Sequence, residues 1–300
     1  MMKFVPSALV AVLSLAGCAH APRAAAPATA AQAATPAEPA GPGADDNLNA
    51  VAWSQNASEH DFIFLQTFRD AQEKLLKAKK DPAWDALPKD DREAHPSLKG
   101  LKPAVVLDID ETALDNSPYQ ARLIRSGGEF NEADWAAWCK EAIARPMPGA
   151  VEFTKFAAGH GIAVIYISNR AKDLDEATLA NLRSAGFPVA GKDSFLGLGT
   201  FVEGCEQVGS EKGCRRQRVA KDYRVLMQFG DQIADFANVP GNTAQGREKA
   251  MTPYTAWIGE RWFVLPNPTY GAWESTLFDN DYTLPRAERR QKKVESLQVK

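Results

Sequence analysis

Short apolar runs alternate with helical patterns through most of the chain. Short, mostly apolar runs at residues 104–107, 162–167 and 224–229 are typical of strands buried on both faces of a parallel sheet, and residues 261–265 are a fourth candidate. Helical patterns lie between these runs, at residues 148–158, 173–185 and 215–221. We therefore expect an α/β fold in which helices cover both faces of a parallel sheet.

Two segments do not fit this alternation. Residues 48–80 carry apolar side chains at helical spacing and predict a long helix or a pair of helices ahead of the first strand. Residues 113–147 interrupt the strand–helix order, and we interpret them as an inserted, mostly helical cap. The folded domain is expected at residues 47–285, followed by a charged, solvated tail at residues 286–300.

The beginning of the chain predicts export. A basic start precedes an apolar run at residues 4–15, which is too short to cross a bilayer and ends in Leu15-Ala16-Gly17-Cys18. This ending resembles the lipobox of bacterial lipoproteins, so we expect a signal peptide at residues 1–18 and a lipid anchor on Cys18. The alternative is an ordinary signal peptide cut a few residues later. Ala19 favours the outer membrane over retention in the inner one, and the Ala/Pro-rich residues 19–46 predict a disordered tether.

Net charge and cysteine spacing bear on the partners of the protein and on its disulfides. The formal net charge is -3 and the pI is about 5.9, so no basic excess favours binding to a nucleic-acid polymer. Cys205 and Cys214 lie close together in a Gly-rich loop, and because the start of the chain predicts export, we expect them to form a disulfide. Cys139 is expected to be a buried thiol. None of the cysteine spacings is typical of a zinc site.

Polar side chains follow the first three predicted strands at the point where each strand ends. The carboxyl ends of parallel strands meet at one edge of a sheet, where ligands bind in open α/β folds. A lone D-x-D motif is a weak signal, because it can also cap a helix. A matched set from three strands predicts a catalytic site instead. Its members are Asp108 and Asp110, Ser168-Asn169-Arg170, and Asp231 and Asp235.

This set of residues resembles a known family. The order D-x-D-x-T, a strand-terminal serine, a lysine and G-D-x-x-x-D is similar to the haloacid dehalogenase superfamily of phosphohydrolases. The four aspartates resemble those of its class C acid phosphatases, the lipoprotein e family of 5'-nucleotidases. The similarity extends from about residue 47 to residue 274, and further stretches that agree are residues 48–51, 215–217, 265–268, 270–271 and 273–274.

The resemblance implies a fold and an activity. The fold would be a Rossmann-like, haloacid dehalogenase-like parallel sheet with a small cap. The protein would be a phosphoric monoester hydrolase that acts on small phosphate monoesters, nucleoside 5'-monophosphates among them.

The resemblance also implies a mechanism. Asp108 would attack phosphorus and form an aspartyl-phosphate. Asp110 would protonate the leaving oxygen and then activate water, which favours an acid pH optimum. Ser168 would bond a phosphoryl oxygen. Mg2+ would take ligands from Asp108, Asp231 and the main-chain carbonyl of Asp110, and Asp235 would be a further ligand or hold a metal-bound water.

The remaining site residues are assigned with alternatives. The family needs a lysine near the phosphate; Lys212 is our choice by spacing, and Lys221 is the alternative, because the cysteine-bearing loop departs from the family pattern. Thr112 is expected to order the motif turn. Asn169 and Arg170 are candidate substrate contacts, although Arg170 could equally pair with an acidic neighbour.

Three aromatic residues are candidates for substrate recognition. Trp135 lies in the expected cap, and Tyr270 and Trp273 lie in the C-terminal stretch that resembles the family. Aromatic faces stack on nucleobases, so these rings would hold a base or another flat ring. The alternative is that they are ordinary core side chains.

Other functions stay open at this point. A phosphatase of the same superfamily acting on sugar phosphates would not use the aromatic residues to hold a base. A non-catalytic lipoprotein that binds heme or a nucleotide would not need the aspartates. The presence of both a nucleophile and a proton donor, in Asp108 and Asp110, counts against a non-catalytic lipoprotein. A phosphotransferase, which passes the phosphoryl group to an alcohol instead of water, would share its first step with a phosphatase. The sequence leaves the oligomeric state open, a homodimer included.

Overall fold

The computed structural model describes residues 45–300, and every element below belongs to that range. The expected signal peptide, Cys18 and all but the last two residues of the expected tether lie outside the described residues. Within residues 45–300, no helix is long and apolar enough to cross a membrane.

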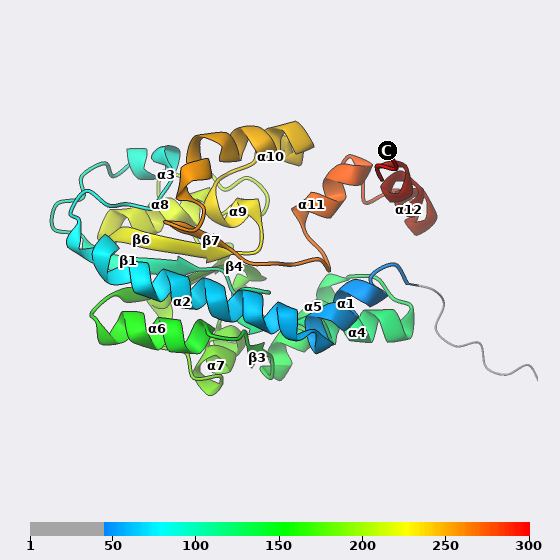
Figure 1. Ribbon diagram of the computed structural model, residues 1–300, viewed down its shortest axis with the longest axis horizontal. Coiled ribbons are helices and arrows are strands. Elements are labelled where there is room, and N and C mark those ends of the chain that lie inside the picture. Colours follow the sequence, from blue (N-terminus) through cyan, green and yellow to red (C-terminus); the bar gives the residue numbers. More distant parts are fainter. Residues whose placement is uncertain (1–44) are drawn as a thin grey trace, which may run out of the picture. The chain divides into compact units, whose positions relative to one another are not determined.

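The centre of the fold is a five-stranded parallel sheet in the order β5-β4-β1-β6-β7 (Figure 1). In the register of the sheet, Val105 of β1 lies opposite Val164 of β4 and Met227 of β6. The four predicted strands are confirmed. The apolar pattern does not predict β5, because this edge strand is only four residues long and contains Gly197. The strands are β1 (Lys102–Leu107), β4 (Ala163–Ala171), β5 (Phe195–Leu198), β6 (Tyr223–Gly230) and β7 (Trp262–Val264).

Helices cover both faces of this sheet, as expected. Successive side chains of β1 point to opposite faces. Val105 and Leu107 belong to the core beneath α2, α6 and α7, whereas Ala104 and Val106 belong to the core beneath α8. Figure 1 shows α2 and α6 on one side of the sheet and α8 on the other. These helices are α2 (Ser58–Lys80), α6 (Ala150–Gly159), α7 (Asp175–Ser184) and α8 (Gly213–Asp222), and the short α3 (Lys89–Glu93) contacts α8.

The expected helical segment at residues 48–80 is a pair of helices. α1 (Leu48–Asn56) ends at Ala57, whose backbone is extended, and α2 begins at the next residue. Asn56 and Ser58 flank this break, and both residue types compete with helical hydrogen bonds through their own side chains. These two residues favour a break between the helices at this point.

The segment interpreted as a cap is mostly helical. It contains α4 (Ser117–Ser126), α5 (Glu132–Glu141) and the short antiparallel pair of β2 (Leu114–Asp115) with β3 (Arg145–Pro146). Pro118 lies in the first turn of α4, and Gly127 ends this helix in a left-handed conformation. α1 contacts α4, so the first helix of the domain lies against this segment.

Residues 286–300 are charged and largely exposed, and within them residues 286–295 form the helix α12 (Arg286–Glu295). α12 buries no residue. It is held by ion pairs, such as Arg286 with Asp45 at 2.7 Å and Lys293 with Glu274 at 2.8 Å. The acidic partners come from distant parts of the chain, so the local charge pattern does not reveal them.

The remaining elements are short helices and 3-10 turns in the loops between the strands and in the C-terminal part of the chain. They are α9 (Ile233–Phe236), α10 (Ala244–Met251), α11 (Ala272–Ser275) and the 3-10 turns η1 (Lys172–Leu174), η2 (Lys192–Ser194), η3 (Pro240–Asn242), η4 (Thr252–Trp257) and η5 (Thr276–Phe278).

Candidate active site

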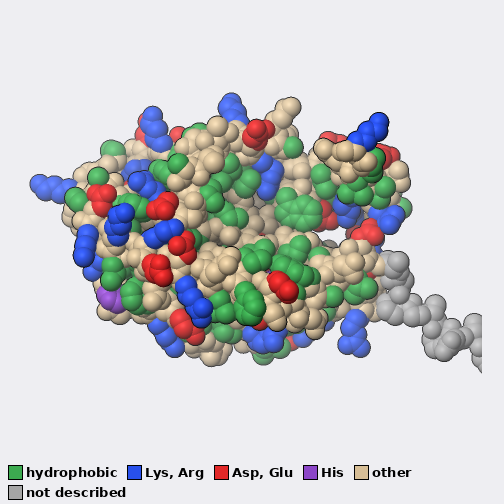
Figure 2. Space-filling model, viewed as in Figure 1, with side chains coloured by type: hydrophobic (Ala, Val, Ile, Leu, Met, Phe, Trp, Pro, Cys, Tyr) green, Lys and Arg blue, Asp and Glu red, His purple; other side chains and the backbone are tan. Residues whose placement is uncertain are grey.

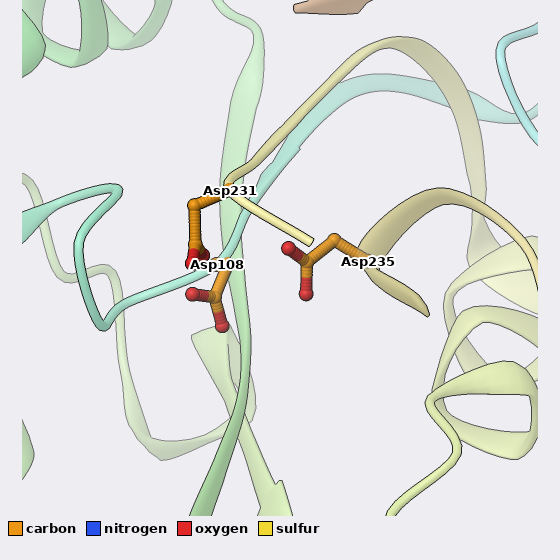
Figure 3. A group of neighbouring side chains, drawn as sticks. All are labelled: Asp108, Asp231 and Asp235. Atoms are coloured by element: carbon orange, nitrogen blue, oxygen red, sulfur yellow. The ribbon is translucent and has the colours of Figure 1, made fainter. Parts of the chain in front are cut away.

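Three carboxylates meet at the carboxyl edge of the sheet. Asp108 follows β1, Asp231 follows β6, and Asp235 lies in α9 directly after it. One oxygen of each lies within 4.8 Å of the others. Figure 3 shows the three side chains pointing toward one another. All the donors are carboxylate oxygens, which are the ligands that hard cations such as Mg2+ prefer.

Lys212 lies directly against this cluster. Its Nζ contacts the carboxylate of Asp108 and lies 2.6 Å from Oδ1 of Asp235. Burial disfavours the charged amine, but the two carboxylates outweigh it and the pKa of Lys212 is raised. Lys221, the alternative lysine, is exposed on α8. The fold therefore brings Lys212, and not Lys221, to the aspartates.

The cluster holds more negative than positive charge. Burial raises the pKa of Asp108 well above its ordinary range, despite the opposing effect of Lys212. Burial and the neighbouring Asp235 raise the pKa of Asp231 to about 7. Three carboxylates beside one ammonium group leave an excess of buried negative charge, which a bound divalent cation would neutralise.

Asp110 belongs to a second, adjacent group. Its carboxylate pairs with the guanidinium of Arg170 at 2.8 Å and accepts hydrogen bonds from Ser168 Oγ at 3.2 Å and Asn116 Nδ2 at 2.9 Å. The Asp110 side chain is not part of the three-carboxylate cluster. Arg170 therefore pairs with an acidic neighbour, which is one of the two roles that its position in the sequence allowed.

The position of Ser168 and Arg170 corrects one expectation. The apolar run predicts that the second strand ends at residue 167, but β4 continues to Ala171. Ser168 and Arg170 thus lie within the strand, alternate with the exposed Asn169, and are both buried. The hydrogen bonds of these two polar side chains to Asp110 compensate for their burial.

Two buried arginines of α8 connect the parts of the site. Arg215 donates hydrogen bonds to the main-chain oxygen of Ser168 at 2.5 Å and to Asn169 Oδ1 at 2.7 Å. Arg216 pairs with the buried Asp91 and donates to the main-chain oxygen of Ala234 at 2.8 Å, next to Asp235. The motif at residues 215–217 is thus explained by contacts that only the fold creates.

The expected disulfide is present. Cys205 and Cys214 are bonded, with their Cα atoms 5.6 Å apart. Cys214 lies in the first turn of α8, two residues after Lys212, so the bond closes the loop that carries this lysine. Cys139 is a buried free thiol, as expected, and burial raises its pKa to about 12.

The three candidate aromatic residues occupy two segments. Trp135 in α5 is half-buried, packs edge-on against Tyr119 at 5.1 Å and lies 5.6 Å from the Arg170 guanidinium. Tyr270 is half-buried, and its hydroxyl contacts Glu111. Trp273 is 37% exposed. Figure 2 shows a hollow on the viewed face, between the segment of α11 and α12 and the rest of the molecule, with hydrophobic side chains around it.

Several polar residues of the site escape the analysis of the sequence. Asn267 donates to Asp231 at 2.8 Å and Gln232 donates to the same carboxylate at 2.7 Å. Asn116 donates to Asp110. Glu111 is buried beside the motif aspartates. Glu111 lies inside the D-x-D-x-T motif, Gln232 inside G-D-x-x-x-D and Asn267 inside the stretch at residues 265–268, so the sequence marks these three positions without indicating their roles, whereas Asn116 carried no signal. Thr112 is buried as well, with its hydroxyl 3.5 Å from Asp231.

Comparison with known proteins identifies the family. A family model described as HAD superfamily, subfamily IIIB (Acid phosphatase), matches residues 44–273. The chain belongs to this acid phosphatase family, which confirms both the resemblance and the fold class.

Solved structures agree with this assignment. The class C acid phosphatase from Bacillus anthracis is 32% identical and superimposes with TM-scores of 0.71 and, with tungstate bound, 0.72; the match covers 85% of this chain and 97% of that one. Among curated relatives, the stem 28 kDa glycoprotein of Glycine max is 26% identical over 180 residues, and vegetative storage protein 1 of Arabidopsis thaliana is 30% identical over 169 residues. These matches span 60% and 55% of this chain, but only 62% and 54% of the two relatives.

Proposed function

We propose that this protein is a Mg2+-dependent acid phosphatase that hydrolyses small phosphate monoesters, with nucleoside 5'-monophosphates as its main substrates. One observation carries the proposal: the buried ammonium group of Lys212 lies against Asp108 within a cluster of three carboxylates at the carboxyl edge of the sheet. Attack on a phosphoryl group needs a nucleophile, fixed positive charge and oxygen ligands for a metal in one place. Membership of the acid phosphatase family supports the same activity.

Asp108 is the proposed nucleophile. Its carboxylate oxygen bonds to phosphorus while the bond from phosphorus to the ester oxygen breaks, which leaves an aspartyl-phosphate. Asp110 gives its proton to the departing oxygen and then takes a proton from the water that hydrolyses the intermediate. Contacts from Ser168, Arg170 and Asn116 hold the Asp110 carboxyl group in one orientation.

Lys212 and Ser168 are the proposed contacts to the phosphoryl oxygens. Lys212 is charged and buried, so its attraction to the phosphate is little screened by water. Arg170 is engaged by Asp110, and we assign it to the orientation of that carboxyl group rather than to the phosphate. Asn169 accepts a hydrogen bond from Arg215, which makes it a structural contact to α8.

The residues present fit a magnesium site. Asp108, Asp231 and Asp235 would hold the cation together with the main-chain carbonyl of Asp110. Bound Mg2+ would supply positive charge that neutralises the phosphoryl oxygens during transfer. Asn267 and Gln232 hold the Asp231 carboxylate in place through hydrogen bonds.

The proposed substrate class rests on the aromatic residues near the site. Trp135 from the cap, with Tyr270 and Trp273 from the C-terminal segment, would stack on a nucleobase. Each such contact contributes about 1–3 kcal/mol.

We also propose that the protein is exported and anchored to the outer membrane through a lipid on Cys18. The lipobox-like ending Leu15-Ala16-Gly17-Cys18 and the Cys205–Cys214 disulfide, which is typical of an oxidising compartment, support this location. Metabolic labelling with a fatty acid should mark the protein and not its Cys18→Ser variant. Labelling of both would remove the anchor from the proposal.

The activity is tested by hydrolysis of AMP and of p-nitrophenyl phosphate, with Mg2+ and with EDTA. We expect metal-dependent turnover that Asp108→Asn abolishes and that Lys212→Met lowers by about 100-fold or more. Lys221→Met is the matched control, because this lysine is exposed on α8, the helix that begins directly after Lys212. Turnover that survives Asp108→Asn would refute the mechanism, and tight nucleotide binding without turnover would favour a ligand-binding lipoprotein.

A further inference from the structure

Glu111 combines two unfavourable features in one residue. Its φ is 58°, in the left-handed region that non-glycine residues rarely occupy. Its side chain is only 6% exposed, and no lysine, arginine or histidine within residues 45–300 forms an ion pair with it. Burial of an unpaired acid and backbone strain both oppose folding. Such costs concentrate at functional sites, yet the proposed mechanism assigns Glu111 no role.

The backbone conformation of Glu111 separates its side chain from that of Asp110. Asp110 contacts Ser168 and Arg170 of β4. Glu111 has two different partners: Oε1 accepts a hydrogen bond from the main-chain N–H of Asn116 at 2.8 Å, and Oε2 contacts the hydroxyl of Tyr270. One carboxylate thus connects the start of the cap to a residue 159 positions further along the chain.

The main chain around Tyr270 is held by other residues. Asn267 donates to Asp231 at 2.8 Å. Gln232 accepts from the main-chain N–H of Ala272 at 3.1 Å and donates to the main-chain oxygen of Tyr270 at 3.4 Å. These contacts hold the backbone and do not involve the aromatic ring. Within residues 45–300, the contact with Glu111 is the hydrogen bond that fixes the ring through its hydroxyl.

We propose that Glu111 is a positioning residue that sets the substrate preference of the site by holding the Tyr270 ring in a fixed orientation. The inference rests on the proposed function, in which Tyr270 stacks on the flat ring of the substrate. A ring that is already oriented loses less conformational freedom when the substrate binds, so affinity for ring-bearing phosphate esters rises. Esters without a flat ring gain nothing from this contact.

A double-mutant cycle with Glu111→Ala and Tyr270→Phe tests the proposal. Both changes remove the contact, and Tyr270→Phe does so without altering the strained backbone. Each is expected to raise KM for AMP by about 5-fold, the cost of ordering one freed side chain when the substrate binds, with kcat nearly unchanged. The double variant should lose no more than either single variant. KM for glycerol phosphate, which has no ring, should change little.

Two further variants serve as controls. Glu111→Gln can still accept from Asn116 and can donate to the Tyr270 oxygen, so it should keep KM for AMP near the wild-type value. Tyr282→Phe removes a hydroxyl from an exposed tyrosine and should have no effect on either substrate. Thermal unfolding of each variant shows whether the fold is intact.

The outcomes separate this inference from the proposed function. Additive effects of Glu111→Ala and Tyr270→Phe, an equal rise of KM for both substrates, or a fall in kcat alone would overturn the positioning role. If Tyr270→Ala leaves KM for AMP unchanged, the stacking part of the proposed function is wrong. If Tyr270→Ala raises KM but Tyr270→Phe and Glu111→Ala do not, only the role of Glu111 is wrong.

Discussion

Replacement of Asp231 by asparagine tests the proposed metal site through stability rather than through activity. Asp231 shares a cluster with Asp108 and Asp235, and Lys212 contacts the latter two carboxylates. Burial, reinforced by the charge of Asp235, raises the pKa of Asp231 from an ordinary 3.8 to about 7. The folded protein therefore holds this proton over a pH range in which the unfolded chain releases it.

The sign of the effect follows from this difference. Because the folded state binds the proton more tightly, the contribution of Asp231 to stability is fully present below about pH 4 and is lost as the pH rises through about 7. At about 1.4 kcal/mol per pKa unit, the loss is roughly 4 kcal/mol at most. Asparagine has no charge to desolvate, but it accepts less well from Gln232 and Asn267, which costs about 1 kcal/mol for each weakened bond.

We therefore expect Asp231→Asn to stabilise the metal-free protein by about 1–3 kcal/mol at about pH 8 and hardly at all at about pH 5. In a domain of this size, that gain raises Tm by about 3–10 °C. The assay is thermal unfolding with EDTA at both pH values, repeated with saturating Mg2+. Magnesium should raise Tm of the wild type and not of the variant, because ligand binding to the folded state alone is stabilising.

Exposed Asp193 provides the matched control, since Asp193→Asn makes the same chemical change away from the cluster. It should leave Tm and the response to Mg2+ unchanged. The reasoning is refuted if metal-free Asp231→Asn is less stable than the wild type at about pH 8. An equal response of wild type and Asp231→Asn to Mg2+ would refute the assignment of Asp231 as a metal ligand.

Three further predictions concern stability. Replacing Cys205 and Cys214 by serine should lower the free energy of unfolding by about 2–3 kcal/mol in urea titrations. Dithiothreitol should cause the same loss in the wild type and no further loss in the double variant. Arg216→Met should lower the free energy of unfolding by about 3–5 kcal/mol, because Asp91 is left buried and unpaired. Adding Asp91→Asn should recover part of this loss, and no recovery would contradict the explanation. Removal of residues 286–300 should lower Tm by only a few degrees, since α12 buries no residue and is held by exposed ion pairs; a large fall would show that α12 belongs to the core.

Much of the fold is readable from local pattern. The strands β1, β4, β6 and β7 are mostly apolar because both faces of a parallel sheet are buried, and this leaves hydrophobic runs that the sequence reveals. The same rule fails for β5, which is short and contains Gly197, and for the end of β4, where Ser168 and Arg170 are polar yet lie inside the strand. Their burial is compensated by Asp110, a partner that lies 58 and 60 positions away in the chain.

The sequence by itself determined which polar side chains lie at or near the carboxyl ends of the strands, because strand position and the order of the motif are local properties. The tertiary structure decided which of them act together. It selected Lys212 over Lys221, although Lys212 and Asp108 are 104 positions apart. It paired Arg170 with Asp110, and it connected Glu111 to Tyr270. These pairings depend on burial and on contacts between distant segments, and both arise only when the chain has folded.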